Sequence, residues 1–192
     1  MKSFEEQKSN LSKFAFQGLI DYDWNKTEIT KINIVFSEIN FLNTVNYIRQ
    51  EVCKNFKILI IDDVKFDNKA FNERLDLSNC IFNGKVEFTN CIFKNEVYFR
   101  GCTFENMLNL KNSNFESKTR FHFSKFKNES CFQNTSFCDL VDFYQTNFEF
   151  TQSFWLTDFL DITIFSNAVF HKQVQFLYNK IGSKTFISFE NA

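Results

Sequence analysis

Phenylalanine recurs at every eleventh position along most of this 192-residue chain, and this spacing restricts the fold more than any other feature. One register consists of Phe71, Phe82, Phe93, Phe104, Phe115, Phe126, Phe137, Phe148, Phe159 and Phe170. A second register with the same step consists of Phe66, Leu77, Phe88, Phe99, Leu110, Phe121, Phe132, Phe143, Phe154, Phe165 and Phe176. The registers interleave at spacings of 5 and 6 without a slip, which excludes chance composition and predicts a stack of repeated units.

Each half-repeat reads small-x-Phe. From Phe82 onward, the residues two places before the first register are all small: Cys80, Cys91, Cys102, Ser113, Ser124, Thr135, Thr146, Thr157 and Ala168. Those before the second register are mostly apolar or β-branched, such as Val64 and Val86. This alternation of period two indicates short extended segments with two side chains inward and one outward. Polar residues such as Asn83-Gly84-Lys85 separate the segments and are typical of turns.

The number of residues per coil follows from the size of the anchors. A coil made of a single 5+6 repeat would have two faces and would have to pack opposing Phe rings inside a narrow tube, which is sterically poor. A coil made of two such repeats has four faces, with one anchor from each meeting at the centre. We therefore expect a four-sided β-solenoid with parallel neighbouring coils about 4.8 Å apart. Residues 66–176 would supply about five such coils.

The repeat resembles that of the pentapeptide-repeat family, whose five-residue unit is small, Asp/Asn-like, Leu/Phe, x, x. Ser113-Asn114-Phe115, Thr146-Asn147-Phe148 and Thr157-Asp158-Phe159 show the unit well. The resemblance implies a right-handed quadrilateral β-helix that is often dimeric, and it implies no single activity. The chain departs from the family pattern by one extra residue in every second unit, where we expect a widened corner or bulge.

Three segments are expected along the chain. Residues 1–57 form an N-terminal segment, in which apolar residues at helical spacing over residues 38–56 predict a capping helix. Residues 58–176 form the solenoid, and residues 177–192 form a C-terminal tail or cap. Caps are expected because the first and last coils of a solenoid leave backbone groups unpaired.

The residues that could carry chemistry have simpler structural explanations. Cys80, Cys91 and Cys102 are each a full repeat apart, unlike the closely spaced pairs of metal sites, and they occupy the small inward position. His122 and His171 are the only histidines, and no nucleophile–base motif accompanies either. The columns containing Asn90, Asn112 and Asn134, and Cys91, Ser113, Thr135 and Thr157, predict side-chain ladders between coils. We therefore expect no catalytic residue, no metal ligand and no cofactor.

The ends and the charge of the chain bear on location and partners. The N-terminal residues are polar and acidic where a secretory signal becomes apolar, no run is long enough for a transmembrane helix, and the net charge is −1. We therefore expect a cytoplasmic protein with reduced cysteines that binds neither nucleic acid nor membrane.

The outward surface changes character near the end of the repeat. Between residues 128 and 171 there is no Lys or Arg, whereas six acidic residues occur. Large apolar residues fall at outward or corner positions in the same region. The candidate interaction surface comprises Tyr144, Phe150, Trp155, Leu156 and Leu160 with the acids Asp142, Glu149 and Asp158. Such a patch is typical of an interface with a second copy or with another protein, unless the C-terminal tail covers it.

The function that these features favour is a non-enzymatic scaffold that mediates protein–protein interaction, with a homodimer through the C-terminal coils as one form. The family resemblance implies a first alternative, a DNA-mimicking protein that binds topoisomerases such as gyrase. That role requires dense negative charge, but residues 66–176 contain 13 acidic and 11 basic residues, a net charge of only −2. A second alternative is a solenoid whose N-terminal segment, residues 1–57, is enzymatic.

Overall fold

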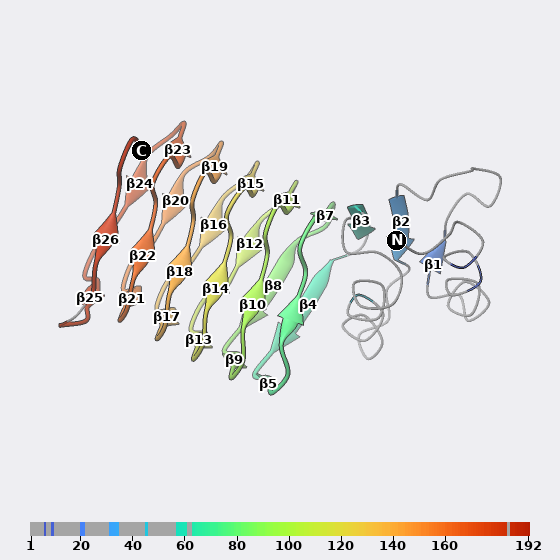
Figure 1. The fold of residues 1–192 in the computed structure, drawn as a ribbon, viewed down its shortest axis with the longest axis horizontal. Coiled ribbons are helices and arrows are strands. Elements are labelled where there is room, and N and C mark those ends of the chain that lie inside the picture. Colours follow the sequence, from blue (N-terminus) through green and yellow to red (C-terminus); the bar gives the residue numbers. More distant parts are fainter. Residues whose placement is uncertain are drawn as a thin grey trace.

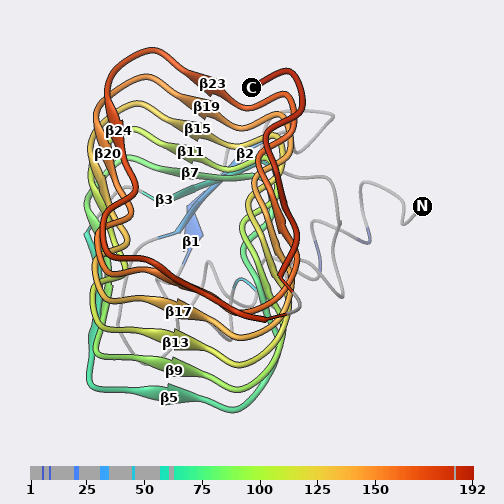
Figure 2. The same ribbon diagram turned by 90° about the vertical axis from the view of Figure 1, so that its left-hand side faces the viewer.

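The computed structural model describes residues 6, 9, 20–21, 31–34, 45, 57–60, 63–183 and 185–192. From Lys57 onward the chain winds into a tube whose wall consists of four β-sheets, seen nearly end-on in Figure 2. We name these sheets A, B, C and D in the order in which the chain visits them, and we name each corner by the two sheets that it joins. The solenoid predicted from the repeat is confirmed.

The strands are distributed over the sheets as follows. Sheet A contains β1 (Ile20–Asp21), β2 (Lys31–Ile34), β3 (Lys57–Ile60), β7 (Cys80–Phe82), β11 (Thr103–Phe104), β15 (Lys125–Phe126), β19 (Asn147–Phe148) and β23 (Val169–Phe170). Sheet B contains β4 (Val64–Asp67), β8 (Val86–Thr89), β12 (Leu108–Asn109), β16 (Ser130–Cys131), β20 (Gln152–Ser153) and β24 (Val174–Gln175). Sheet C contains β5 (Ala70–Phe71), β9 (Ile92–Phe93), β13 (Asn114–Phe115), β17 (Ser136–Phe137), β21 (Asp158–Phe159) and β25 (Lys180–Ile181). Sheet D contains β6 (Leu75–Asp76), β10 (Val97–Tyr98), β14 (Thr119–Arg120), β18 (Val141–Asp142), β22 (Thr163–Ile164) and β26 (Ile187–Ser188).

Neighbouring strands of the solenoid are parallel, and equivalent residues lie one turn of 22 residues apart, as Val97 lies opposite Thr119. Figure 1 shows the successive turns side by side along the axis. Sheets B, C and D have six strands each, so there are six turns where the anchors predict about five. The difference arises because pairing begins before the first Phe anchor, at the buried Ile58 and Ile60, and continues after Phe176 in β25 and β26.

The anchor side chains fill the tube in columns parallel to its axis. Equivalent rings on successive turns stack, with centroids 5.1 Å apart for Phe82 and Phe104 and 4.8 Å apart for Phe121 and Phe143. Rings from opposite sides of the tube meet edge to face, as Phe132 of sheet B does with Phe143 of sheet D at an interplanar angle of 90°. Burial of each ring contributes about 1.5–3 kcal/mol, and each aromatic contact contributes about 0.5–1.5 kcal/mol more.

The BC and DA corners are tight turns in which the anchors are five residues apart. At the DA corner, the N–H of Cys80 donates to the carbonyl oxygen of Leu77, and Asn79 has a φ of 57°. This is the geometry of a type II turn, whose third residue must adopt a left-handed backbone. Left-handed residues recur at every eleventh position, namely at Asn68, Asn79, Asn90, Gly101, Asn112, Phe123, Asn134, Gln145, Leu156, Asn167 and Tyr178. Asn dominates the set because its short polar side chain tolerates this backbone.

The AB and CD corners hold the extra residue of every second unit. The anchors on either side of these corners are six residues apart, and an Asn or Asp commonly occupies the corner. Its side chain accepts a hydrogen bond from the next backbone N–H, as Asn95 does from Glu96 at 2.9 Å. Because both wide corners take one extra residue, opposite sides of the tube stay in register and the coil remains four-sided.

Side-chain ladders connect the turns at the BC corner, as the sequence predicts. The side-chain N–H of Asn112 donates to Asn90 at 2.9 Å, and that of Asn134 donates to Asn112 at 3.1 Å. The neighbouring small residues satisfy carbonyl groups of the preceding turn, since Ser113 Oγ donates to the carbonyl oxygen of Phe88 at 2.7 Å. On the DA side, Cys102 Sγ makes the equivalent contact with Leu77 at 3.0 Å. Cysteine thus occupies the serine position of the repeat.

The N-terminal segment continues sheet A beyond the first turn. Strand β2 pairs in parallel with β3 over four residues, and β1 pairs with β2 in the antiparallel direction. The predicted capping helix over residues 38–56 lies outside the described residues except for Val45, which is helical and buried in the core. In the described part of the chain, no helix has the length and hydropathy needed to cross a membrane.

Candidate interaction surface

The eight residues predicted to form one surface lie on three sides of the tube. Two lie on sheet D or the DA corner, two lie at the AB corner, and four cross sheet C with its two corners. In chain order these are Asp142 and Tyr144, Glu149 and Phe150, and Trp155, Leu156, Asp158 and Leu160. The structure therefore brings together the last four and separates them from the others.

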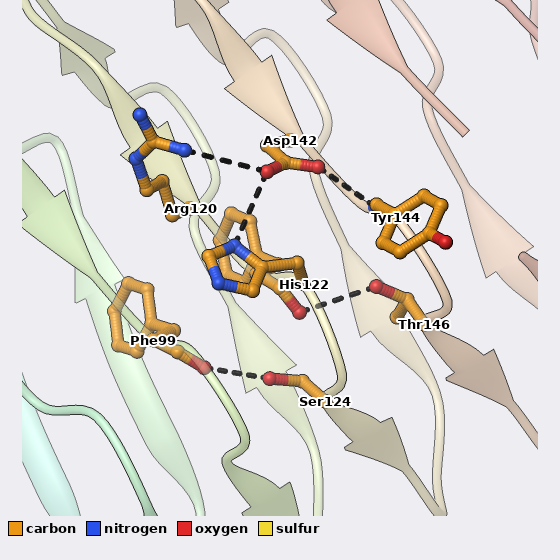
Figure 3. Close-up of polar contacts among 8 residues, drawn as sticks. Phe99, Arg120, His122, Ser124, Asp142, Tyr144 and Thr146 are labelled. Atoms are coloured by element: carbon orange, nitrogen blue, oxygen red, sulfur yellow. Dashed lines mark hydrogen bonds and ion pairs between the residues drawn. The ribbon is translucent and has the colours of Figure 1, made fainter. Parts of the chain in front are cut away.

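Asp142 lies at the centre of a polar cluster on the outside of sheet D, which Figure 3 shows. Its Oδ2 lies 3.2 Å from Nδ1 of His122 and 3.5 Å from a terminal nitrogen of Arg120, both on the preceding turn. Its Oδ1 accepts the backbone N–H of Tyr144 at 2.9 Å. Because this carboxylate is the acceptor within reach of Nδ1, we assign the imidazole proton to that nitrogen.

The environment of Asp142 favours its charged form. Burial alone raises the pKa of this carboxyl, but the hydrogen bonds from His122 and from the Tyr144 N–H outweigh burial and hold the pKa below its ordinary value. Asp142 is only 8% exposed. The prediction of Asp142 as a surface acid is therefore corrected, because its oxygens bind groups of its own chain. Within the described residues, no three His, Cys, Asp or Glu side chains gather as metal ligands would.

Phe150 and Glu149 are exposed at the AB corner, between β19 and β20. The residues one turn before and after Phe150 are Asn128 and Lys172, so no column of apolar residues passes through Phe150. Single exposed apolar residues are common on soluble proteins and require no special explanation.

Sheet C and its corners carry the densest exposed apolar surface. We define the C face as the outward residues of the last turns at the BC corner, sheet C and the CD corner. Its apolar members are Trp155, Leu156, Leu177 and Tyr178 at the BC corner, and Leu140, Leu160, Ile162 and Phe186 at the CD corner. Tyr178 is 78% exposed and Phe186 is 64% exposed. Two apolar ridges therefore flank the outward side of sheet C (Figure 2, where β5, β9, β13 and β17 mark this side).

Five apolar members of the C face were absent from the residues predicted from the sequence, namely Leu140, Ile162, Leu177, Tyr178 and Phe186. Leu177 and Tyr178 lie one turn after Trp155 and Leu156, since the N–H of Leu156 donates to the carbonyl oxygen of Leu177. The 22-residue step of the repeat, continued past Phe176, places Leu177 and Tyr178 at the BC corner. Phe186 lies beside Ile162 only because the last turn contains two extra residues, which move the partner of Thr163 to Ile187. The repeat carries no signal for this insertion.

Two members of the C face occupy left-handed turn positions. Leu156 has a φ of 56° and Tyr178 has a φ of 55°, in the column that Asn90, Asn112 and Asn134 occupy on earlier turns. A left-handed backbone costs a residue with a bulky side chain about 1–2 kcal/mol. Neither side chain has the amide that the ladder requires, so neither residue is explained by the stability of its own turn.

Three carboxylates lie among these apolar residues. Asp158 points outward from β21, and Asp139 and Asp161 lie one turn apart at the CD corner. Asp139 and Asp161 each accept the next backbone N–H with one oxygen, at 2.6 Å, and Asp158 accepts Ser136 Oγ at 3.3 Å. Within the described part of the chain, none of the three forms an ion pair. Lys180 is the only cation among the described residues of the C face.

Within the described part of the chain, no element covers the last turn of the tube. The last strand of each sheet, namely β23, β24, β25 and β26, has a neighbour on one side only. The inward residues of this turn are partly open, with Ile181 49% and Phe189 47% exposed. The tail does not fold over Trp155 and Leu156, because residues up to Ser188 form strands of the last turn instead.

The repeat can be compared with known families. Residues 66–114 match a family model described as pentapeptide repeats (9 copies). No curated protein and no solved structure matches the chain. The matched residues lie in the early turns, before the apolar C face begins. The resemblance indicated by the small-x-Phe pattern is thus confirmed over residues 66–114, which match the repeat of the pentapeptide-repeat family.

Proposed function

We propose that the protein is a non-enzymatic cytoplasmic scaffold that associates with a second copy of itself through its last turn. The observation that carries the proposal is the last described turn, where four edge strands surround partly open core residues. Unpaired strand edges beside apolar side chains are a liability for a soluble protein unless a partner covers them.

A second copy fits this end because the end of that copy has the same outline and the same incomplete columns of stacked anchor side chains. The last rings stack on those of the preceding turn, with centroids 5.0 Å apart for Phe165 and Phe189 and 4.8 Å apart for Phe154 and Phe176. Among the described residues, no further turn contacts the outer faces of Phe176 and Phe189. A twofold axis across the end would let each copy supply the missing layer to the other, which is the usual closed symmetry of a dimer.

The test is the solution mass of the full chain, measured by light scattering across a range of concentrations. We expect twice the chain mass of 22.9 kDa for the wild type and the monomer mass for Phe189→Glu, which places a charge in the open core. Ile92→Glu is the matched control, because Ile92 is an exposed apolar residue on an early turn of sheet C. It should leave the dimer intact.

Two outcomes would overturn the proposal. One is a wild type that remains monomeric at every concentration, and the other is a Phe189→Glu variant that remains dimeric. Thermal melting by circular dichroism shows whether that variant is folded. If it is not, Ile181→Asp on the neighbouring sheet C of the same turn provides the second test.

A further inference from the structure

The C face lies on the side of the tube, so stacking through the end does not cover its ridges on the penultimate turn. We infer that the C face binds an amphipathic protein segment that carries Lys or Arg beside its apolar side chains. The inference concerns a surface separate from the end, and it does not depend on self-association.

The apolar part of the argument rests on position within the repeat. At the BC corner, Gln133 and Asn134 are followed one turn later by Trp155 and Leu156, and then by Leu177 and Tyr178. The polar pair would serve the turn at least as well, because Asn suits the left-handed position. The apolar pairs lack an Asn at the left-handed position, and they expose large side chains to water. Contact with an apolar partner compensates for both costs.

The charged part of the argument selects the kind of partner. Asp139, Asp158 and Asp161 lie between or beside the ridges, and none of them has a cationic partner in the described part of the chain. An acidic segment or an anionic lipid surface would be repelled by this arrangement, whereas Lys or Arg side chains would neutralise it. Earlier turns differ, because Lys111 and Lys118 occupy the same side of the tube there.

The spacing of the ridges suits a helical segment. Successive turns of the solenoid are about 4.8 Å apart, and successive turns of an α-helix rise by about 5.4 Å. A helix lying along sheet C would therefore meet a pair such as Trp155 and Leu177 with residues one helical turn apart. Apolar anchors at intervals of three and four residues are the usual means of docking a helix in an apolar groove.

The probe is a fluorescein-labelled peptide of Leu and Lys in a helical amphipathic pattern, and fluorescence anisotropy measures its binding to the full chain. A length of about 18 residues gives the peptide roughly five helical turns. The matched probe replaces every Lys with Glu. We expect the Lys peptide to bind and the Glu peptide not to bind. Asp158→Lys/Asp161→Lys should weaken the binding of the Lys peptide by about tenfold or more, and added salt should weaken the wild-type complex.

Two further variants separate specific docking from general attraction. Glu149→Lys/Glu129→Lys makes the same change of net charge at the AB corner and should leave the affinity within about twofold, because surface charges beyond a Debye length are largely screened. Trp155→Gln/Leu156→Asn introduces the residues of the preceding turn at the BC corner and should abolish binding while the fold is kept. The inference is overturned if the two peptides bind equally, if the AB variant weakens binding as much as the C-face variant, or if Trp155→Gln/Leu156→Asn binds like the wild type.

Discussion

The middle turns and the last two turns have the same backbone geometry at the BC corner, but the side chains at this corner have different roles. At the BC corner, Asn90, Asn112 and Asn134 adopt left-handed φ angles and join successive turns through amide hydrogen bonds. Leu156 and Tyr178 adopt almost the same φ angles and continue the same column without such bonds. The early corners therefore stabilise the tube, whereas the late corners present apolar side chains outward. A residue that retains the left-handed φ angle but makes no ladder hydrogen bond is a candidate for contact with another molecule.

The largest effect is expected from two anchors of sheet B, one in each region. Phe132→Ala should lower the free energy of unfolding by about 3–5 kcal/mol, because Phe132 is fully buried and stacks on Phe154 at 4.6 Å. Phe176→Ala should cost less than half as much in dilute solution, because Phe176 is only partly buried and has rings on one side. Urea unfolding followed by circular dichroism measures both. Equal costs would contradict the view that the last turn is an open end.

A smaller effect is expected when the late-corner residue is introduced into the middle of the ladder. Asn112→Leu removes the hydrogen bonds to Asn90 and Asn134 and places a bulky residue at a left-handed position. The expected loss is about 2–3 kcal/mol in the free energy of unfolding. Asn112→Gly separates the two causes, since Gly accepts the backbone and lacks the ladder bonds. A Leu variant as stable as the wild type would mean that the ladder contributes nothing.

The reverse substitution should stabilise the protein. Leu156→Asn relieves the left-handed strain and can donate to Asn134 Oδ1, extending the ladder by one turn. We expect a gain of about 1–2 kcal/mol in the free energy of unfolding, together with weaker binding at the C face. Thermal and urea unfolding test the first part, and the peptide titration tests the second. If Leu156→Asn lowers the stability, Leu156 has a structural role that its exposure does not reveal.

The smallest effect concerns the pH dependence of stability and involves Asp142 on sheet D. Because the pKa of Asp142 is lowered in the folded state, its carboxylate contributes stability above the unfolded pKa of about 3.9, and this contribution is lost as the pH falls through the lower folded pKa. Asp142→Asn should therefore destabilise the protein at neutral pH and lose less stability than the wild type on acidification. Melting temperatures measured between neutral and strongly acidic pH test this. Parallel pH profiles would show that His122 and Arg120 do not stabilise the carboxylate.

Much of the fold could be predicted because the repeat places the same kinds of side chain at the same positions of every turn. The spacing of Phe82, Phe88 and Phe93 sets the sides of the tube, and the 22-residue coil follows from the size of the rings. The same 22-residue spacing predicts which side chains form the ladders between turns. The sequence predicts less well where a turn departs from the repeat, as at the two-residue insertion that places Phe186 beside Ile162.

The candidate surface was harder to predict because the repeat tells which residues point outward but not which side they face unless the corners are assigned. Trp155, Leu156 and Leu160 look like neighbours of Tyr144 and Phe150 in the sequence, but they lie on different sides of the tube. Asp142 looks like a surface acid until its contacts with His122 and Arg120 on the preceding turn are known. Such contacts depend on side-chain geometry that the spacing of anchors does not contain.

Hydrogen–deuterium exchange at two protein concentrations tests most directly whether the last turn is completed by a second copy. The account predicts slow, concentration-independent exchange in the middle turns, such as residues 97–137. It predicts exchange in residues 174–189 that is fast in dilute solution and slows as the concentration rises, because the edge strands β24 and β26 then gain a partner. Exchange in residues 174–189 that is the same at both concentrations would contradict it.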